Sequence, residues 1–192
     1  MDKAEMVMDV QVVESLRARN AQAFRSLIER LQQPMTGYLY RLVGDREVAL
    51  DLAQDTFLQA YKEIGKTSQD LCVDAWIYRI ATNYALRYLN RKRLRQFVGL
   101  DSPSNPEDFN IHLMVPGPEH QAETRILVQQ TLSKMKPKDA ACLQLHYGDG
   151  FTYEEIGLVL EMTPEAVRKR VARCVEKFRT LYEASSQTSG IE

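Results

Sequence analysis

The chain has 192 residues, of which 44% are hydrophobic, and a formal net charge of −1. This hydrophobic content fits a folded protein and excludes wholesale disorder, and the near-zero charge excludes a uniformly basic surface for nucleic acid. The three cysteines (Cys72, Cys142 and Cys174) are odd in number and far apart, which favours packing roles over a disulfide framework or a zinc site. Because no signal-peptide pattern and no apolar run of about 20 residues occurs, we expect a soluble, cytoplasmic protein.

The N-terminal half of the sequence shows the apolar periodicity of helices. Apolar positions predict a helix over residues 12–31 that is interrupted near Arg19 and Asn20. We expect Pro34 to open a separate helix over residues 35–43, because a proline is tolerated in a first turn but disrupts a helix interior. No run of alternating apolar and polar residues predicts a strand. The fold class is therefore predicted to be all-α.

Two aspartates mark the starts of the next predicted helices. Asp45 is a candidate N-cap for a long helix, since an aspartate side chain accepts hydrogen bonds from the free N–H groups of a first turn. A polar loop over residues 65–73 follows, and Asp74 is expected to cap a helix that runs to about Arg95. Residues 1–95 are thus predicted to form an N-terminal helical bundle.

The helix after Asp74 is predicted to carry a polar ridge, because four polar residues recur at four-residue steps on one face. They are Arg79, Asn83, Arg87 and Arg91, and Trp76 lies at the head of the helix. Single-stranded DNA binding typically uses three kinds of group: cations that follow the phosphate backbone, an amide that reads a base edge and a ring that stacks on a base. The alternative is a core helix with solvated arginines, and for Trp76 and Tyr84 a packing role is at least as well supported.

A change of composition divides the chain. Residues 87–95 hold five cations and no acid, which favours an anionic partner there. Residues 96–120 hold four acids, four prolines and no lysine or arginine, and this predicts a flexible linker that reaches about 80 Å when extended. A second small helical domain is predicted over residues 121–184, followed by a polar, disordered tail over residues 185–192.

The sequence TYEEIGLVLEMTPEAVRKRVARCVEKFR, at residues 152–179, predicts two short helices joined by a tight turn. Thr152 and Glu155, three residues apart, form a capping box for the first helix. Thr163 is a candidate N-cap for the second, and Pro164 occupies its first position, where a missing N–H costs nothing. This pattern is typical of a helix-turn-helix.

The second helix of this motif is predicted to bury one face and to expose cations on the other. Val167 and Val171 recur at helical spacing, whereas Lys169 points away from them with Arg173 close by, and Arg168 and Arg170 lie on the flanks. A helix that is packed on one side and cationic on the other enters the major groove of duplex DNA. The alternative is an ordinary amphipathic surface helix with solvated charges.

Residue types that carry out catalysis or bind metals are not grouped in this sequence. His112, His120 and His146 lie apart, with no metal-ligand spacing and no nucleophile paired with a base. We therefore expect no catalytic site, no metal and no cofactor, and the protein is not predicted to be an enzyme.

Three motifs occur together in an order that resembles one known family. They are DREVALDLAQDTFLQAYKEI at residues 45–64, DAWIYRIATNYALRYLNRKR at residues 74–93, and the helix-turn-helix. Apart from the linker and tail, nearly the whole chain resembles the group IV, extracytoplasmic-function (ECF) sigma factors of bacterial RNA polymerase. The resemblance implies an alternative sigma factor that binds core RNA polymerase and promoter DNA, both duplex and single-stranded, and that an anti-sigma protein holds inactive.

The resemblance also assigns residues to three surfaces. The first docks on the clamp helices of the polymerase through Asp51, Gln54, Asp55 and Leu58. The second melts the −10 element and captures an unstacked base; its members are Trp76, Arg79, Asn83, Arg87 and Arg91. The third reads the −35 element as duplex through Thr163, Glu165, Arg168, Lys169 and Arg173. The linker is implied to thread the active-site and RNA-exit path of the polymerase.

The sequence departs from the family pattern at several of these positions. In the predicted loop, residues 67–69 lack the aromatic-basic-glycine pattern that is common in the family. In the helix after it, Arg87 stands where an aspartate or asparagine is frequent. In the helix-turn-helix, Lys169 replaces a small hydroxyl residue and Glu161 replaces the usual turn glycine. Each departure affects which promoter is read. Two alternatives remain: a polymerase-independent helix-turn-helix regulator, which would dimerise on a palindromic site, and an interaction module that has kept the fold as a docking scaffold.

Overall fold

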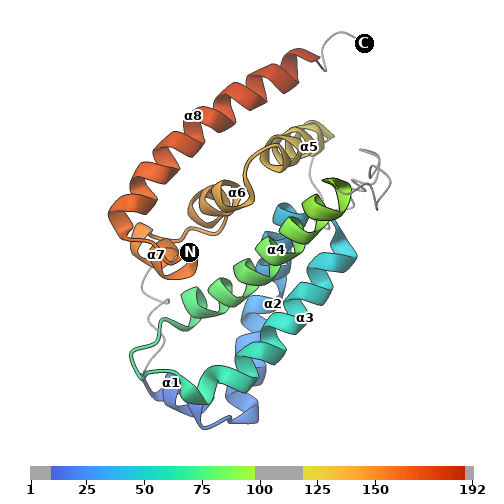
Figure 1. Ribbon diagram of the computed structural model, residues 1–192. Helices are drawn as coiled ribbons and strands as arrows, with labels where there is room; N and C mark the ends of the chain where they lie inside the picture. Colours follow the sequence, from blue (N-terminus) through green and yellow to red (C-terminus); the bar gives the residue numbers. More distant parts are fainter. Residues whose placement is uncertain (1–9, 98–118, 189–192) are drawn as a thin grey trace.

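The computed structural model describes residues 10–97 and 119–188, and every regular element in these two ranges is helical, as predicted (Figure 1). The N-terminal elements are α1 (Val10–Arg17), α2 (Ala21–Val43), α3 (Arg46–Glu63), the short 3-10 turn η2 (Ile64–Lys66) and α4 (Val73–Phe97). The C-terminal elements are α5 (Glu119–Ser133), α6 (Pro137–Leu143), the π-helical turn η4 (Gln144–Gly148), α7 (Tyr153–Leu160) and α8 (Pro164–Thr188). Most of the predicted linker lies outside the described residues.

The predicted break between α1 and α2 is confirmed and has two local causes. Arg19 adopts a left-handed backbone conformation with a φ of 57°, and the Asn20 side chain caps α2 by accepting a hydrogen bond from a first-turn N–H. The second predicted break is wrong, because α2 runs through Pro34 as one helix. A proline inside a helix costs about 3 kcal/mol, but Leu31 and Met35 on either side of it are buried in the core, and this packing keeps both halves helical.

The two predicted aspartate caps have different outcomes. The Asp45 side chain accepts a hydrogen bond from the Val48 N–H at 3.0 Å and caps α3, as predicted. α4 begins at Val73, so Asp74 lies inside its first turn and does not cap it. The Asp74 carboxylate instead accepts two hydrogen bonds from the guanidinium of Arg30 in α2. The cap prediction failed because this partner is 44 residues away in the sequence and leaves no local signal.

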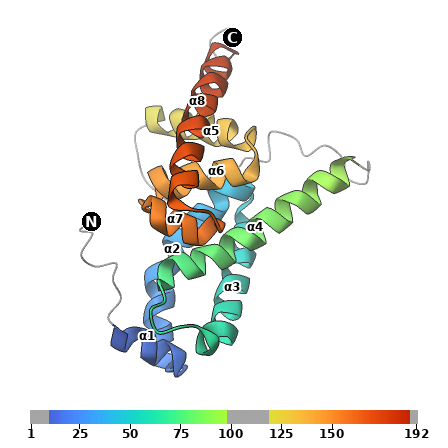
Figure 2. The ribbon, with the colours of Figure 1, turned by 60° about the vertical axis from the view of Figure 1, so that its left-hand side comes forward.

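The start of α4 is buried on every side. The six consecutive residues from Val73 to Tyr78 are all buried, and because a helix has about 3.6 residues per turn, six consecutive side chains point in all directions. Helices α2, α3 and α7 all contact α4, and Figure 2 shows α7 of the C-terminal domain against the start of α4. The C-terminal half of α4 projects from the body of the molecule (Figure 2).

The long helix α8 forms the outer side of the C-terminal domain and packs on α5, α6 and α7 (Figure 1). It continues to Thr188 and so includes half of the segment expected to be a disordered tail. Ser185 is buried and its Oγ lies 2.8 Å from the Lys134 Nζ, which donates a hydrogen bond to it. The prediction of a disordered tail was based on its polar composition alone. Composition does not reveal the tertiary contact between Ser185 and Lys134 that orders the start of this segment.

Candidate nucleic-acid interface

The turn between α7 and α8 has the geometry of a helix-turn-helix. Thr152 Oγ1 accepts a hydrogen bond from the Glu155 N–H, and the Glu155 carboxylate accepts one from the Thr152 N–H, so the predicted capping box is confirmed. Glu161 ends α7 in a left-handed conformation with a φ of 55°. Thr163 Oγ1 accepts a hydrogen bond from the Ala166 N–H at 3.3 Å, which confirms the predicted cap of α8.

Sequence reasoning missed one residue of this motif, Gly157. It is buried in α7, and a Cβ at this position would lie 2.6 Å from the carbonyl oxygen of Met162 in the turn. A backbone oxygen cannot move aside as a flexible side chain can, so the turn approaches α7 this closely only over a glycine. A glycine inside an apolar helix is the sequence signal that could have indicated this approach.

The outward face of α8 carries the residues predicted to read duplex DNA. All five are exposed, namely Thr163, Glu165, Arg168, Lys169 and Arg173. Val167 and Val171 on the opposite face are buried, as predicted. Glu165 and Lys169 form an ion pair at 2.8 Å, one turn apart. Arg170 faces the domain instead and lies 3.7 Å from a carboxylate of α6, so it does not belong to the outward face.

The polar ridge of α4 lies on the surface beyond the buried first turns. Asn83, Arg87 and Arg91 are exposed, and Arg79 is partly exposed. Trp76 is only 6% exposed, so its ring is not available to stack on a base in this arrangement of the chain. Tyr78 is buried as well, and its ring centroid lies 4.7 Å from that of Phe151 in the loop before α7.

The four α3 residues that the resemblance assigns to polymerase docking are all exposed. They are Asp51, Gln54, Asp55 and Leu58. Leu58 is 52% exposed, and Leu50, two turns earlier on the same helix, is 45% exposed. All of these except Asp55 line a groove of about 460 Å³ between α2 and α3, with Phe57 also in its wall. Large apolar side chains exposed beside a groove indicate a protein-binding surface.

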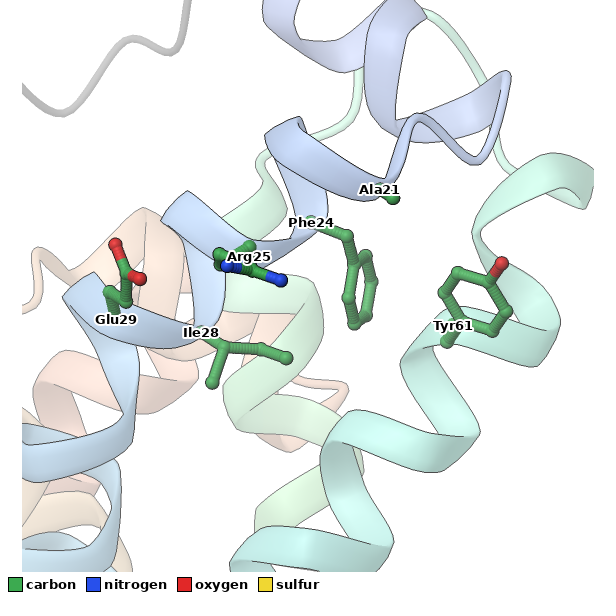
Figure 3. Close-up of a pocket in the computed structure, with 6 residues that line it drawn as sticks. All are labelled: Ala21, Phe24, Arg25, Ile28, Glu29 and Tyr61. Atoms are coloured by element: carbon green, nitrogen blue, oxygen red, sulfur yellow. The ribbon is translucent and has the colours of Figure 1, made fainter.

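A second depression, of about 470 Å³, adjoins this groove and shares Phe24, Ile28 and Tyr61 with it. Figure 3 shows Phe24 of α2 and Tyr61 of α3 facing each other, and their rings meet edge to face with centroids 5.0 Å apart. Tyr61 is 41% exposed and was not among the predicted site residues. Its spacing from Leu50 and Leu58 places it on the same helix face, which is the signal that could have found it.

Other kinds of site are not found in the part of the chain that the structure describes. Within residues 10–97 and 119–188, no three histidine, cysteine, aspartate or glutamate side chains are grouped so as to hold a metal ion. No helix in these ranges combines the length and the apolar character that crossing a bilayer requires.

Both halves of the chain match known protein families. Residues 27–95 match sigma-70 region 2, and residues 125–178 match sigma-70 region 4. The RNA polymerase sigma-H factor of Pseudomonas aeruginosa is 30% identical over 177 residues, which cover 88% of this chain and 90% of that protein. The chain belongs to the sigma-70 family of RNA polymerase sigma factors.

Further relatives agree with the ECF type. The ECF RNA polymerase sigma-E factor of Haemophilus influenzae is 28% identical to this sigma factor over 180 residues, covering 90% of this chain and 94% of that protein. The fold is shared with the sigma factor RpoE in its co-crystal structure with the anti-sigma factor NepR from Bartonella quintana, with a TM-score of 0.67. The two chains are 18% identical, and the match covers 83% of this chain and 96% of that chain. This sigma factor is therefore of the ECF type, with the groove and the α4 ridge in region 2 and the cationic face of α8 in region 4.

Proposed function

We propose that this sigma factor binds core RNA polymerase and directs promoter-specific transcription initiation, reading the −35 element with α8 and opening the −10 element with α4. The observation that carries this proposal is the presence of two chemically different polar surfaces on two domains. The outward face of α8 is cationic and belongs to a helix-turn-helix, which suits duplex DNA. The ridge of α4 combines an amide with arginines along a projecting helix, which suits a separated strand.

The outward face of α8 would enter the major groove with its N-terminal turns. Lys169 and Arg173 are placed to donate hydrogen bonds to base edges, since lysine and arginine commonly bind the O6 and N7 atoms of guanine. Arg168, on the flank of this face, is placed to contact phosphates, which fixes the register of the helix on the duplex. Glu165 and Lys169 form an exposed ion pair on this face, and because such a pair contributes at most about 1 kcal/mol, the ammonium group can leave it for a base edge.

The ridge of α4 would hold the non-template strand after the duplex opens. The Asn83 amide carries both a donor and acceptors, so it can read a base edge, and Arg87 and Arg91 follow it along the helix at phosphate-binding positions. Unstacking a base costs a few kcal/mol. The contacts of this ridge are therefore what keeps the −10 element open once it has melted.

The groove between α2 and α3 would dock on a helix of the polymerase. Leu50 and Leu58 supply exposed apolar side chains, and the acidic residues Asp51 and Asp55 border them. An apolar groove with charged rims is the usual surface for an amphipathic helix of a partner. This assignment follows the family resemblance, which places the clamp helices of the largest polymerase subunit at these positions.

A protein inhibitor belongs to the same proposal. The fold is shared with a sigma factor whose structure was solved together with an anti-sigma factor. By analogy, an anti-sigma protein would cover the polymerase-binding groove or the DNA-reading faces of this chain. Co-purification of a partner that blocks transcription would identify it, and the absence of such a partner under non-inducing conditions would contradict this part of the proposal.

Gel filtration with sigma-free core RNA polymerase tests the proposed function. We expect stoichiometric co-elution of the wild-type chain, loss of co-elution for Leu58→Arg, and unchanged co-elution for Val10→Arg, which alters a comparably exposed apolar residue of α1. Absence of binding by the wild-type chain at micromolar concentration would contradict the proposal. It would favour the polymerase-independent regulator, for which a dimer is the diagnostic observation.

A further inference from the structure

Helix α1 lies against the junction between α3 and α4, as Figures 1 and 2 show. It contacts η2, and Val13 and Leu16 of α1 are buried together with Ile64 of η2. We name residues 67–72, which connect η2 to α4, the 67–72 loop. Burial of apolar side chains therefore holds α1 at the point where the chain leaves α3 and enters this loop.

Arg19, in the turn after α1, connects this turn to the end of α3. Its guanidinium Nη2 donates a hydrogen bond to the backbone carbonyl of Lys62 at 3.2 Å, and its Cζ lies over the Tyr61 ring, 5.7 Å from the centroid. The last four carbonyls of a helix carry the negative end of its dipole, so a cation placed there is stabilised. The face of a tyrosine ring also attracts a cation. Arg19 therefore fixes the end of α3 relative to α1.

The backbone of this turn is shaped for the same contact. Arg19 has a φ of 57°, a left-handed conformation that glycine adopts at a lower cost than arginine. At Gly65 in η2, a Cβ would lie 3.4 Å from the carbonyl oxygen of Arg17 and 4.0 Å from the Arg19 Nε, so the turn and η2 are in van der Waals contact. A strained arginine at this point indicates that its side chain has a use.

The 67–72 loop is tied to η2 and to α1. Thr67 Oγ1 donates a hydrogen bond to the first carbonyl of η2 at 2.7 Å, and Gln69 Nε2 donates one to Glu14 Oε1 of α1 at 3.4 Å. The tip of the loop, at Ser68, Gln69 and Asp70, is exposed. Hydroxyl, amide and carboxylate groups can all form hydrogen bonds with base edges. The tip therefore combines base-reading chemistry with an attachment to α1.

The position of the loop places it in line with the polar ridge of α4. The ridge begins at Arg79, six residues after the first residue of α4, and a rise of 1.5 Å per residue makes this distance about 9 Å along the helix. A separated strand that follows the ridge towards the start of α4 therefore reaches the 67–72 loop. Because Trp76 is buried there, the exposed tip of the loop supplies the groups that meet an unstacked base.

We propose that α1 is a positioning element for reading the −10 element: Arg19 and Glu14 fix the 67–72 loop, and the position of the loop decides which base of the separated strand is accepted. Both residues act through the loop and not by touching DNA. This inference rests on the proposed function, because it concerns the base that α4 and its preceding loop receive. It adds a part of the chain that lies before the match to sigma-70 region 2, which begins at residue 27.

Three variants of the full chain separate the side-chain contact from other effects. Arg19→Gly removes the guanidinium and suits the left-handed backbone, so the turn itself is not strained. Arg19→Lys keeps a cation that can donate a hydrogen bond to the same carbonyl. Lys62→Ala is the matched control, because it removes one exposed positive charge of this region but leaves the backbone carbonyl that Arg19 contacts.

Two measurements follow the loop and its reading of bases. Hydrogen exchange of the backbone amides of residues 64–72, measured by mass spectrometry without DNA, reports how firmly the loop is held. For base choice, each variant is combined with core RNA polymerase and a pool of forked DNA, randomised in the −35 duplex and in the single-stranded −10 positions, and the bound DNA is sequenced. A poorly folded variant would bind less of every sequence, whereas a displaced loop changes the base ratios at its own position.

We expect the loop amides of Arg19→Gly to exchange about fivefold faster than those of the wild type. The same variant should lose about fivefold or more of the base preference at one or two −10 positions and keep its −35 preferences. Lys62→Ala should match the wild type, and Arg19→Lys should recover most of the preference. Wild-type exchange or wild-type base preferences in Arg19→Gly would overturn the inference and leave the proposed function intact. If the wild type neither binds core polymerase nor selects a sequence, the proposed function fails and this inference is overturned with it.

Discussion

The guanidinium of Arg30 and the carboxylate of Asp74 meet in a two-fold hydrogen-bonded pair, with N–O distances of 2.7 and 2.6 Å. The pair joins α2 to the first turn of α4. The Asp74 side chain is 10% exposed and that of Arg30 is 43% exposed, so the carboxylate is largely shielded from water. This contact helps to fix the direction in which α4, which carries the polar ridge, leaves the core.

Replacing Asp74 with alanine should lower the free energy of unfolding by about 1–2 kcal/mol. Hydrogen bonds to charged groups contribute about 1.5–3 kcal/mol, and the partial exposure of Arg30 reduces this through solvent screening. Urea denaturation followed by far-ultraviolet circular dichroism measures the change. Asp70→Ala, which removes an exposed carboxylate of the preceding loop, is the matched control. Equal effects of the two substitutions would contradict a structural role for the pair.

Replacing Gly157 with alanine should destabilise the helix-turn-helix. The new Cβ would lie 2.6 Å from the Met162 carbonyl oxygen, so the turn must move, at a cost of about 1–3 kcal/mol. Because the turn sets the angle between α7 and α8, affinity for duplex promoter DNA should fall as well. Thermal melting and fluorescence anisotropy with a −35 duplex measure the two effects. Leu158→Ala, at an exposed neighbouring position, should change neither the melting temperature nor the affinity.

Replacing Lys169 and Arg173 together with alanine should abolish recognition of the −35 element. The slope of log affinity against log salt concentration should change little, because this slope counts neutralised phosphates and these two side chains are proposed to contact base edges. Binding titrations of a promoter duplex over a range of salt concentrations give this slope. The control removes the same charge further along α8 with Lys177→Ala and Arg179→Ala, both exposed in the wild type. A double variant with wild-type affinity would contradict the assignment of this face.

The features that the sequence predicted correctly are those set by neighbouring residues. The capping box of Thr152 and Glu155 spans three positions, and the outward direction of Lys169 and Arg173 follows from helical spacing alone. The break at Asn20 also has a local cause, the side-chain cap of α2. Local chemistry was therefore sufficient to place the helix-turn-helix and its exposed cations.

The features that the sequence did not predict depend on partners far along the chain. Arg41 of α2 and Asp149 of the C-terminal domain form an ion pair although they are 108 residues apart, and neither belongs to a recognisable motif. α2 continues through Pro34 because the surrounding core outweighs a local propensity. The groove between α2 and α3 likewise exists only where two helices pack. Helical spacing does not reveal contacts between distant residues. The family resemblance assigned Asp51, Gln54 and Leu58 of the groove wall to docking, but the groove itself and the interdomain contact were not predicted.

The three cysteines should differ in reactivity towards iodoacetamide at pH 8. Burial raises the pKa of Cys142 to about 11 and that of Cys174 to about 12, so both thiols stay protonated at pH 8 and the reactive thiolate is scarce. Cys72 is half-buried, and burial raises its pKa as well. Mass spectrometry of peptides should show Cys72 labelled first and the other two labelled only after denaturation. Rapid labelling of Cys142 or Cys174 in the folded chain would contradict their placement in the core.

Replacing Asn83 with alanine should impair promoter opening while leaving polymerase binding intact. Asn83 is exposed on the α4 ridge, away from the α2–α3 groove that is proposed to dock on the polymerase, so the substitution removes base-edge hydrogen bonds without disturbing that groove. Permanganate reactivity of unpaired thymines at the −10 element measures opening, and co-elution with core polymerase measures binding. Gln33→Ala changes an exposed amide of α2 and should affect neither. A normal open bubble in the Asn83 variant would exclude this amide from strand capture and leave the arginines of the ridge, which only donate hydrogen bonds, to hold the strand.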